Sequence, residues 1–296
     1  MQDTKIYSYI FKPQGKIRGI IQIVHGITEH MGRYQEFANY CTNHGFIVYG
    51  IDLVGHGKSL YQGHIKGYFG KEGSWENVVN DVYNSYLQIK EKYPDLPYYL
   101  IGFSLGSFIV RNLMIENRSL KINACLLLGT GYQSPILLKM VKFVVKQNGK
   151  KAGEEHSTSL IDNLAFKNYN KKFKDASSNA DWLLEDKKAR KQYLNDPLCL
   201  KHVSAGLFRE LLNGMIITND SKAKIYLQCP VYLLSGKNDA VGEFGKGVNK
   251  AATLLLKQGA NIKKIKLFEN MRHDILHEKN CQEVYAYILD IIEKNL

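Results

Sequence analysis

The sequence has few cysteines, and their placement excludes two classes of small, cross-linked protein. There are five of them, an odd number, and no two have the C-x-x-C spacing of zinc knuckles and redox motifs. A chain of 296 residues can also bury most of its unfolded surface without covalent staples. We therefore expect a reduced protein with no disulfide framework and no metal site. The cysteines are Cys41, Cys125, Cys199, Cys229 and Cys281.

Long apolar runs are also lacking. No stretch approaches the roughly eighteen apolar residues from which a transmembrane helix is recognised. The first residues, MQDTKI, lack the basic patch and following apolar run of a secretory signal. The sequence thus predicts a cytoplasmic protein.

Basic residues are numerous but are not concentrated in any one tract. The chain has 40 Lys and Arg against 28 Asp and Glu, a formal net charge of +12. No helix-turn-helix, RNP or zinc-finger pattern accompanies them, so we expect no binding to nucleic acid. Two explanations of the charge stay open: a lysine-rich proteome, or an anionic membrane surface or phospholipid substrate.

What the sequence does contain is an alternation of short β-branched runs with longer amphipathic stretches. This alternation is typical of an α/β fold, a mostly parallel central sheet flanked by helices. The expected strands are Ile6–Phe11, Gly19–Val24, Phe46–Ile51, Tyr98–Gly102, Ala124–Leu128, Val231–Leu234 and Lys263–Leu267. The expected helices are Tyr34–Asn43, Trp75–Lys92, Leu105–Glu116, Phe244–Lys257 and Cys281–Glu293.

The alternation breaks between about Tyr132 and Ile216, where no strand pattern occurs. An insertion of roughly eighty residues is far longer than an ordinary loop, and such insertions commonly cover a binding crevice. We predict a core of residues 1–131 and 217–296 and a helical lid of residues 132–216. Within the lid we expect helices over Ile136–Lys146, Ala180–Asn195 and Leu207–Leu212, and a polar stretch around Gly149–Ser159.

The central motif is Gly102-Phe103-Ser104-Leu105-Gly106, a G-x-S-x-G sequence. It directly follows one expected strand and directly precedes an expected helix, which is the context of a nucleophile elbow. A serine that merely caps a crossover helix would give a similar local pattern. The strand, sharp turn and helix together favour Ser104 as a nucleophile.

A serine hydroxyl needs a base, and the base needs a carboxylate to orient it. Asp239 and His273 each follow an expected strand, and the order Ser, Asp, His is that of α/β-hydrolases. The sequence therefore predicts the triad Ser104, Asp239 and His273. Asp52, which also ends a strand, is the alternative acid, and His277 is the nearest rival base.

Ester hydrolysis also requires hydrogen-bond donors for the oxyanion of the tetrahedral intermediate. One expected donor is the backbone N–H of Leu105, directly after the nucleophile at a helix N-terminus. The other is the backbone N–H of Ile27, in the loop after the strand Gly19–Val24.

Four motifs in order resemble the monoacylglycerol lipase and lysophospholipase group of the α/β-hydrolases. The segment 25–34, HGITEHMGRY, resembles H-G-x-x-E-H-x-x-R-Y, and the segment 52–59, DLVGHGKS, resembles D-x-x-G-H-G-x-S. The elbow and the pair Arg272-His273 complete the set. Phe103 departs from the histidine found before the nucleophile in many members, and Asp274 from a glutamate often found after the catalytic histidine.

The resemblance implies hydrolysis of single-chain lipid esters through an acyl-serine intermediate, a cap above the site, and no metal or cofactor. Related proteins also hydrolyse short or aromatic esters and N-terminal peptides, so these activities stay open. A peptidase would need a carboxylate near the pocket, for which Glu154, Glu155 and Asp181 are candidates. A non-catalytic ligand-binding homologue is the alternative of another class.

The expected lid helix Ile136–Lys146 is basic and amphipathic. Lys139, Lys142 and Lys146 share one face, while apolar residues lie elsewhere on the helix. Two interpretations stay open: transient contact with an anionic membrane, or an apolar face packed over the pocket with the lysines in water.

Overall fold

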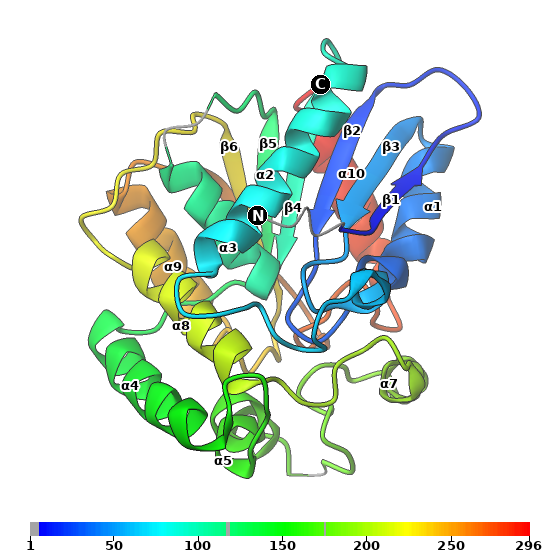
Figure 1. Ribbon diagram of the computed structural model, residues 1–296. Helices are drawn as coiled ribbons and strands as arrows, with labels where there is room; N and C mark the ends of the chain where they lie inside the picture. The colour runs from blue at the N-terminus through cyan, green and yellow to red at the C-terminus, as the bar shows by residue number, and fades with distance from the viewer. Residues whose placement is uncertain (1–5, 117–118, 175) are drawn as a thin grey trace.

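The computed structural model describes residues 6–116, 119–174 and 176–296, and it contains one central seven-stranded sheet (Figure 1). The order of the strands is β1-β3-β2-β4-β5-β6-β7. Only β1 runs antiparallel to its neighbour, and the remaining pairs are parallel, so the predicted mostly parallel sheet is confirmed. The strands are β1 Ser8–Phe11, β2 Gly19–Val24, β3 Phe46–Ile51, β4 Tyr98–Phe103, β5 Ala124–Leu128, β6 Pro230–Gly236 and β7 Asn261–Phe268.

Helices cover both faces of the sheet, because the central strands are apolar on both sides. Every residue of β2, β3, β4 and β5 is buried. Helices α1 (Gln35–Asn43) and α10 (Cys281–Glu293) pack on one face. Helices α2 (Trp75–Lys92), α3 (Leu105–Ile115) and α9 (Lys246–Lys257) pack on the other. Short 3₁₀ helices, η1 (Met31–Tyr34) and η2 (Gly57–Gln62), lie in the loops after β2 and β3.

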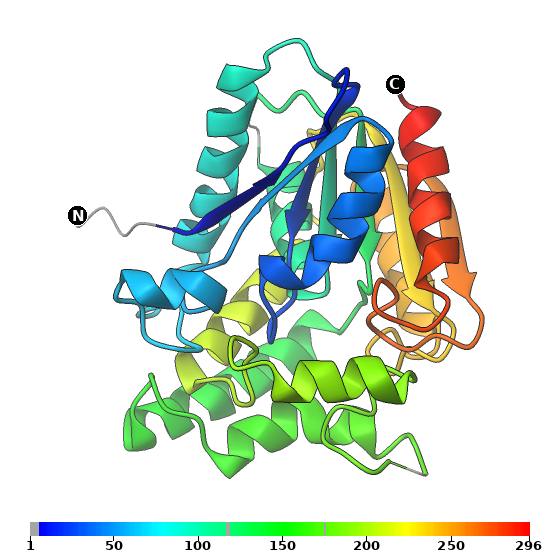
Figure 2. The same ribbon diagram turned by 90° about the vertical axis from the view of Figure 1, so that its right-hand side faces the viewer.

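Between β5 and β6 the chain forms a helical insertion, defined here as residues 135–218, which lies across one end of the sheet (Figure 2). Its described residues contain no strand. The boundaries of the lid expected from the sequence, 132 and 216, remain a prediction. The insertion comprises α4 Pro135–Ala152, α5 Ser159–Asp162, the π-helical turn η3 Asn163–Lys167, α6 Asn168–Asn170, α7 Lys187–Asn195 and α8 Ala205–Thr218.

Two expectations about helices of the insertion are wrong. The helix expected over Ala180–Asn195 begins only at Lys187, because Asp186 caps it by accepting the N–H groups of Lys188 and Ala189. The helix expected to end at Lys146 continues to Ala152, into the segment read as a polar stretch. Residues 180–186 instead form turns beside the sheet edge.

A buried arginine forms hydrogen bonds to residues at both ends of the insertion. Arg111, in α3, is fully buried, and its guanidinium donates to the carbonyl oxygen of Gly131 at 3.1 Å. It also donates to the carbonyl oxygen of Thr218 at 3.1 Å and to Asn219 Oδ1 at 2.7 Å. The helix that follows the elbow is therefore fastened to the residues where the insertion leaves and re-enters the core.

Over the described residues, no helix combines the length and the apolar composition needed to cross a membrane.

Candidate active site

Ser104 lies in a strained turn between β4 and α3. Its φ of 50° and ψ of −113° fall in a region that non-glycine residues rarely occupy. Flanking glycines are required by close packing: a Cβ on Gly106 would lie 2.0 Å from the carbonyl oxygen of Val24. A Cβ on Gly102 would lie 2.5 Å from the carbonyl oxygen of Gly106. This strand–turn–helix geometry is that of a nucleophile elbow.

Asp239 and His273 are brought together from the loops after β6 and β7. His273 Nδ1 donates to Asp239 Oδ2 at 2.9 Å, and both side chains are buried. Asp239 Oδ2 also accepts from Ser235 Oγ at 2.8 Å, and Oδ1 accepts from the N–H of Val241 at 2.8 Å. These donors fix the carboxylate, which in turn orients the imidazole.

The His273 ring lies between two aromatic side chains. Ring centroids are 4.9 Å apart for Phe103 and 5.4 Å apart for Trp182, which comes from the insertion. The other ring nitrogen, Nε2, is buried without a hydrogen-bond partner. His273 and Ser104 line the same small cavity.

Gly129 is a site residue that sequence reasoning missed. It follows β5 with a φ of 57°, and a Cβ there would lie 2.8 Å from Cε1 of His273. The catalytic histidine expected from the sequence thus occupies space that only glycine leaves free at this position. A glycine directly after the apolar run Ala124–Leu128 was the available signal.

The loop after β2, called here the oxyanion loop (residues 25–30), lies against the elbow. Ile27 lines the same cavity as Ser104, and Leu105 is the first residue of α3. The carbonyl oxygen of Ile27 lies 2.7 Å from His56 Nε2. The N–H of Gly26 donates to Glu29 Oε1 at 2.8 Å. Ile27 thus lies at the cavity that Ser104 lines, and the roles of the Ile27 and Leu105 N–H groups as oxyanion donors remain a prediction.

Two buried histidines support this loop. His25 Nδ1 lies 2.7 Å from the carbonyl oxygen of Gly26, and its Nε2 accepts the N–H of Leu53 at 2.9 Å. Burial lowers the pKa of His25 to about 3 and that of His56 to about 4. The His25 ring, whose Nε2 accepts a hydrogen bond, is therefore neutral at physiological pH.

The rival residues have other contacts. Asp52 Oδ1 accepts the N–H of Met31 at 2.7 Å, and Oδ2 accepts the N–H of Lys58 at 2.7 Å. His277 Nδ1 lies 2.7 Å from Asp274 Oδ1. Neither Asp52 nor His277 lines the cavity that contains Ser104.

Two cavities lie one behind the other at this end of the molecule. The inner one, with Ser104 and His273, has a volume of about 10 Å³, at the lower limit for one water molecule. The outer one, within the insertion, has a volume of about 470 Å³. Thr28, Trp182 and Tyr193 line both, so the two cavities adjoin at these side chains.

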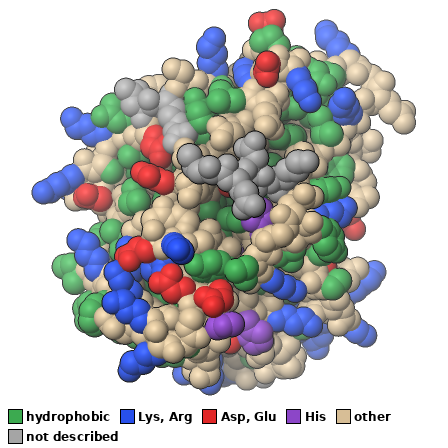
Figure 3. Space-filling view, in the orientation of Figure 1, with side chains coloured by type: hydrophobic (Ala, Val, Ile, Leu, Met, Phe, Trp, Pro, Cys, Tyr) green, Lys and Arg blue, Asp and Glu red, His purple; other side chains and the backbone are tan. Residues whose placement is uncertain are grey.

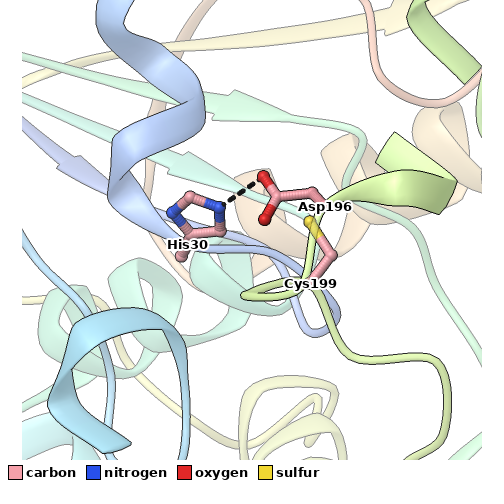
Figure 4. Close-up of side chains that lie close together, drawn as sticks. All are labelled: His30, Asp196 and Cys199. Carbon is pink, nitrogen blue, oxygen red and sulfur yellow. Dashed lines mark hydrogen bonds and ion pairs between the residues drawn. The ribbon is translucent and has the colours of Figure 1, made fainter. Parts of the chain in front are cut away.

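A second polar cluster joins the insertion to the oxyanion loop (Figure 4). Figure 4 shows His30, Asp196 and Cys199, whose ligand atoms lie within 4.8 Å of one another; such groups are ligands that zinc accepts. His30 Nε2 and Asp196 Oδ2, however, already bond each other at 2.9 Å, and burial raises the pKa of the Cys199 thiol. We interpret the cluster as a hydrogen-bonded contact that fastens the insertion to the core.

Comparisons with known proteins agree with this geometry. The family described as serine aminopeptidase, S33 matches residues 15–280. A monoglyceride lipase homolog of monkeypox virus is 25% identical over 99% of this chain and 94% of its own length. Monoglyceride lipase of Rattus norvegicus is 26% identical over 96% of this chain and 84% of its own.

A solved structure has the same fold as this chain. A thermostable carboxyl esterase from Bacillus coagulans, in complex with glycerol, superposes with a TM-score of 0.86 at 25% identity. The match covers 98% of this chain and 94% of that one. Fold, elbow and family match agree along most of the sequence: the chain belongs to the serine aminopeptidase S33 family and is a serine hydrolase of the α/β-hydrolase fold.

Proposed function

We propose that this enzyme hydrolyses carboxylic esters of single-chain lipids, such as monoacylglycerols or lysophospholipids, through an acyl-serine intermediate. The observation that carries the proposal is His273, which is bonded to the buried Asp239 and lines the same cavity as the strained Ser104. This arrangement supplies a nucleophile, a base and a carboxylate that orients the base.

In the proposed mechanism, His273 Nε2 removes the proton of Ser104 as the hydroxyl oxygen attacks the ester carbonyl carbon. The backbone N–H groups of Ile27 and Leu105 stabilise the resulting oxyanion, where one such donor contributes about 2.7–4 kcal/mol. His273 then protonates the departing alcohol, and it activates the water that hydrolyses the acyl-serine. Asp239 fixes the tautomer of the imidazole and stabilises its cation.

The outer cavity supports a substrate of lipid size. Its volume of about 470 Å³ lies in the range of sites for drug-sized ligands. The cavity is lined in part by apolar side chains, Phe166, Leu194 and Leu200, and in part by polar ones such as Asn163 and Asn170. Two relatives carry the name monoglyceride lipase, which agrees with an amphipathic substrate. We propose that the insertion is the lid above this site.

The peptidase alternative lacks a free carboxylate in the expected places. Glu154 pairs with Arg209, and Asp181 pairs with Arg190 at 2.7 Å. Neither these two nor Glu155 lines the inner or the outer cavity. A substrate amine would therefore meet none of the three carboxylates considered for it.

A second part of the proposal is transient contact with an anionic membrane through α4. Large apolar side chains of α4 face outward, with exposed fractions from 43% to 74%. They are Ile136, Leu137, Met140, Phe143 and Val144. The α4 lysines Lys139, Lys142 and Lys146 line a groove between α4 and α8, next to this apolar face. An apolar face beside basic side chains is what an interfacial helix presents to anionic lipid.

The contrary interpretation, in which the apolar face of α4 covers the pocket, does not match these contacts. No residue of α4 lines either cavity. Elsewhere on the view in Figure 3, Lys and Arg side chains are scattered over the surface and form no single tract.

Co-sedimentation with vesicles tests the contact between α4 and the membrane: binding should favour anionic over neutral vesicles and should fall for Phe143→Ser. Equal binding to both vesicle types contradicts it.

The catalytic proposal is tested by a chain-length series of p-nitrophenyl esters, measured beside monoacylglycerol and lysophosphatidylcholine. We expect higher kcat/KM for long acyl chains, whereas preference for acetate favours the short-chain esterase alternative. A fluorophosphonate probe should label the wild type and not Ser104→Ala. Equal labelling of both would falsify the assignment of the nucleophile, and absence of any ester turnover would favour a ligand-binding homologue.

A further inference from the structure

Arg33 lies between two buried carboxylates that belong to different loops of the site. Its guanidinium contacts Glu29 Oε2 through Nη1 and Asp274 Oδ2 through Nη2, the latter at 2.9 Å. The side chains of Glu29, Arg33 and Asp274 are 3%, 8% and 2% exposed, so these charges have left water almost completely. An arginine with its fork-shaped set of donors can serve both carboxylates in one plane.

On one side, Arg33 acts on the oxyanion loop. The second oxygen of Glu29, Oε1, accepts the N–H of Gly26 at 2.8 Å and the hydroxyl of Tyr34 at 2.7 Å. Gly26 directly precedes Ile27, whose N–H is the proposed donor to the oxyanion. The position of that donor therefore depends on where Arg33 holds Glu29.

On the other side, Arg33 acts on the loop that carries His273, called here the histidine loop (residues 271–278). Asp274 directly follows His273, and its N–H donates to the carbonyl oxygen of Leu183 in the insertion at 2.9 Å. Its second oxygen, Oδ1, lies 2.7 Å from His277 Nδ1, and His277 Nε2 lies 2.9 Å from the carbonyl oxygen of Arg33 itself.

We propose that Arg33 is a positioning residue, which sets the distance between the oxyanion-hole donor on one loop and the general base on the other. The inference rests on the proposed function, because it assigns Arg33 a part in the same reaction. The donor and the base act on opposite sides of one tetrahedral carbon, and a misplacement of about 1 Å can cost about a hundredfold in rate. A single guanidinium between two carboxylates thus links the two loops that carry these groups.

The test is Arg33→Lys, which keeps the charge but removes the two-sided contact. We expect kcat to fall between about tenfold and a hundredfold, with KM changed less than about threefold. The matched control is Arg209→Lys. Arg209 is also buried between two carboxylates, Glu154 and Glu210, but lines neither cavity. It should lower the melting temperature comparably and leave kcat within about twofold.

A second variant, Asp274→Asn, keeps the shape of the side chain and removes its charge. We expect it to lower kcat about fivefold or more, and the double variant with Arg33→Lys should lose less than the product of the single losses. If Arg33→Lys fails to fold, Asp274→Asn alone decides. The inference would be overturned if Arg33→Lys had the same kcat as Arg209→Lys. It would also be overturned if the loss of kcat in the double variant equalled the product of the two single losses.

These outcomes are distinct from failure of the proposed function. A wild-type protein that is labelled at Ser104 by a fluorophosphonate and hydrolyses p-nitrophenyl esters supports that function, whatever Arg33→Lys does. A wild-type protein that does neither contradicts the proposed function itself and, with it, the assignment of Arg33.

Discussion

Gly129 has no side chain and therefore leaves space for the His273 ring. Its φ of 57° is one that L side chains rarely adopt, and an added Cβ would lie 2.8 Å from Cε1 and 3.1 Å from Nδ1 of the ring. Because Nδ1 is the atom that bonds Asp239, a side chain here would displace the imidazole from its orienting carboxylate. A single methyl group at this position therefore acts on the proposed base directly.

We predict that Gly129→Ala lowers kcat by at least tenfold and the free energy of unfolding by about 1–3 kcal/mol. Ester turnover and urea unfolding measure the two effects. Gly63→Ala is the matched control: Gly63 also has a positive φ, 90°, but nothing lies within 4 Å of its Cβ position. It should lose stability and keep its kcat. A Gly129→Ala enzyme with unchanged kcat would contradict this placement of the ring.

At this scale, the residues that sequence reasoning predicted are those whose signal is local. Ser104 stands in a motif between a strand and a helix, and Asp239 and His273 each follow a strand. For Gly129 the sequence offers only a glycine after an apolar run, and for Trp182 we see no local signal. Their contacts with His273 span more than ninety positions of the chain, so a local pattern does not reveal them.

At the scale of an element, segment 180–186 also depends on distant contacts that its own sequence does not reveal. Its sequence suggested helix, but the N–H groups of Glu185 and Asp186 donate to the buried carboxylate of Glu278, at 2.8 and 3.0 Å. That carboxylate also accepts the N–H of Arg272, next to His273. Hydrogen bonds to a distant residue thus replace those of a helical turn and hold Trp182 over the histidine loop. The strands, by contrast, were predictable because burial on both faces leaves continuous apolar runs.

Trp182 lines both the inner and the outer cavity, so we expect its removal to join the two spaces. We predict that Trp182→Ala raises the ratio of kcat/KM for a long-chain ester to that for an acetate by roughly tenfold. The comparison uses p-nitrophenyl esters. Trp75→Phe is the control, since Trp75 is buried against Asn112 and lines neither cavity. An unchanged ratio would show that the indole does not limit access.

Arg111 makes the insertion and the core one cooperative unit. Its removal would leave the carbonyl oxygens of Gly131 and Thr218 without this donor in a buried place. We predict that Arg111→Met lowers the free energy of unfolding by about 2–4 kcal/mol. Urea unfolding measures it. Lys237→Met, which removes an exposed pair with Glu269, should change it by less than about 1 kcal/mol. Similar losses in both variants would contradict the role given to Arg111.

For the whole molecule, the buried His25 predicts how stability depends on pH. The pKa of His25 is lowered to about 3, so between pH 6.5 and about 3 the unfolded chain binds a proton that the folded chain does not. The free energy of unfolding must therefore fall as the pH falls through this window. Asp81 opposes part of the effect, because burial raises its pKa to about 6.

His25 contributes a loss of roughly 2 kcal/mol between pH 7 and pH 5, and Asp81 offsets about 1 kcal/mol of it. Urea unfolding at pH 7, 6 and 5 measures the net change. A free energy of unfolding that does not fall over this range would show that the His25 ring is not held neutral by the fold.

The small inner cavity has a consequence for covalent reagents. A space of about 10 Å³ beside Ser104 is smaller than an acylating group, so we expect a reagent to react only after the Trp182 indole moves aside. The rate of inactivation should then stop rising with reagent concentration once it equals the frequency of these openings. For such reagents we expect potency to depend on this motion of the protein more than on the reactivity of the warhead.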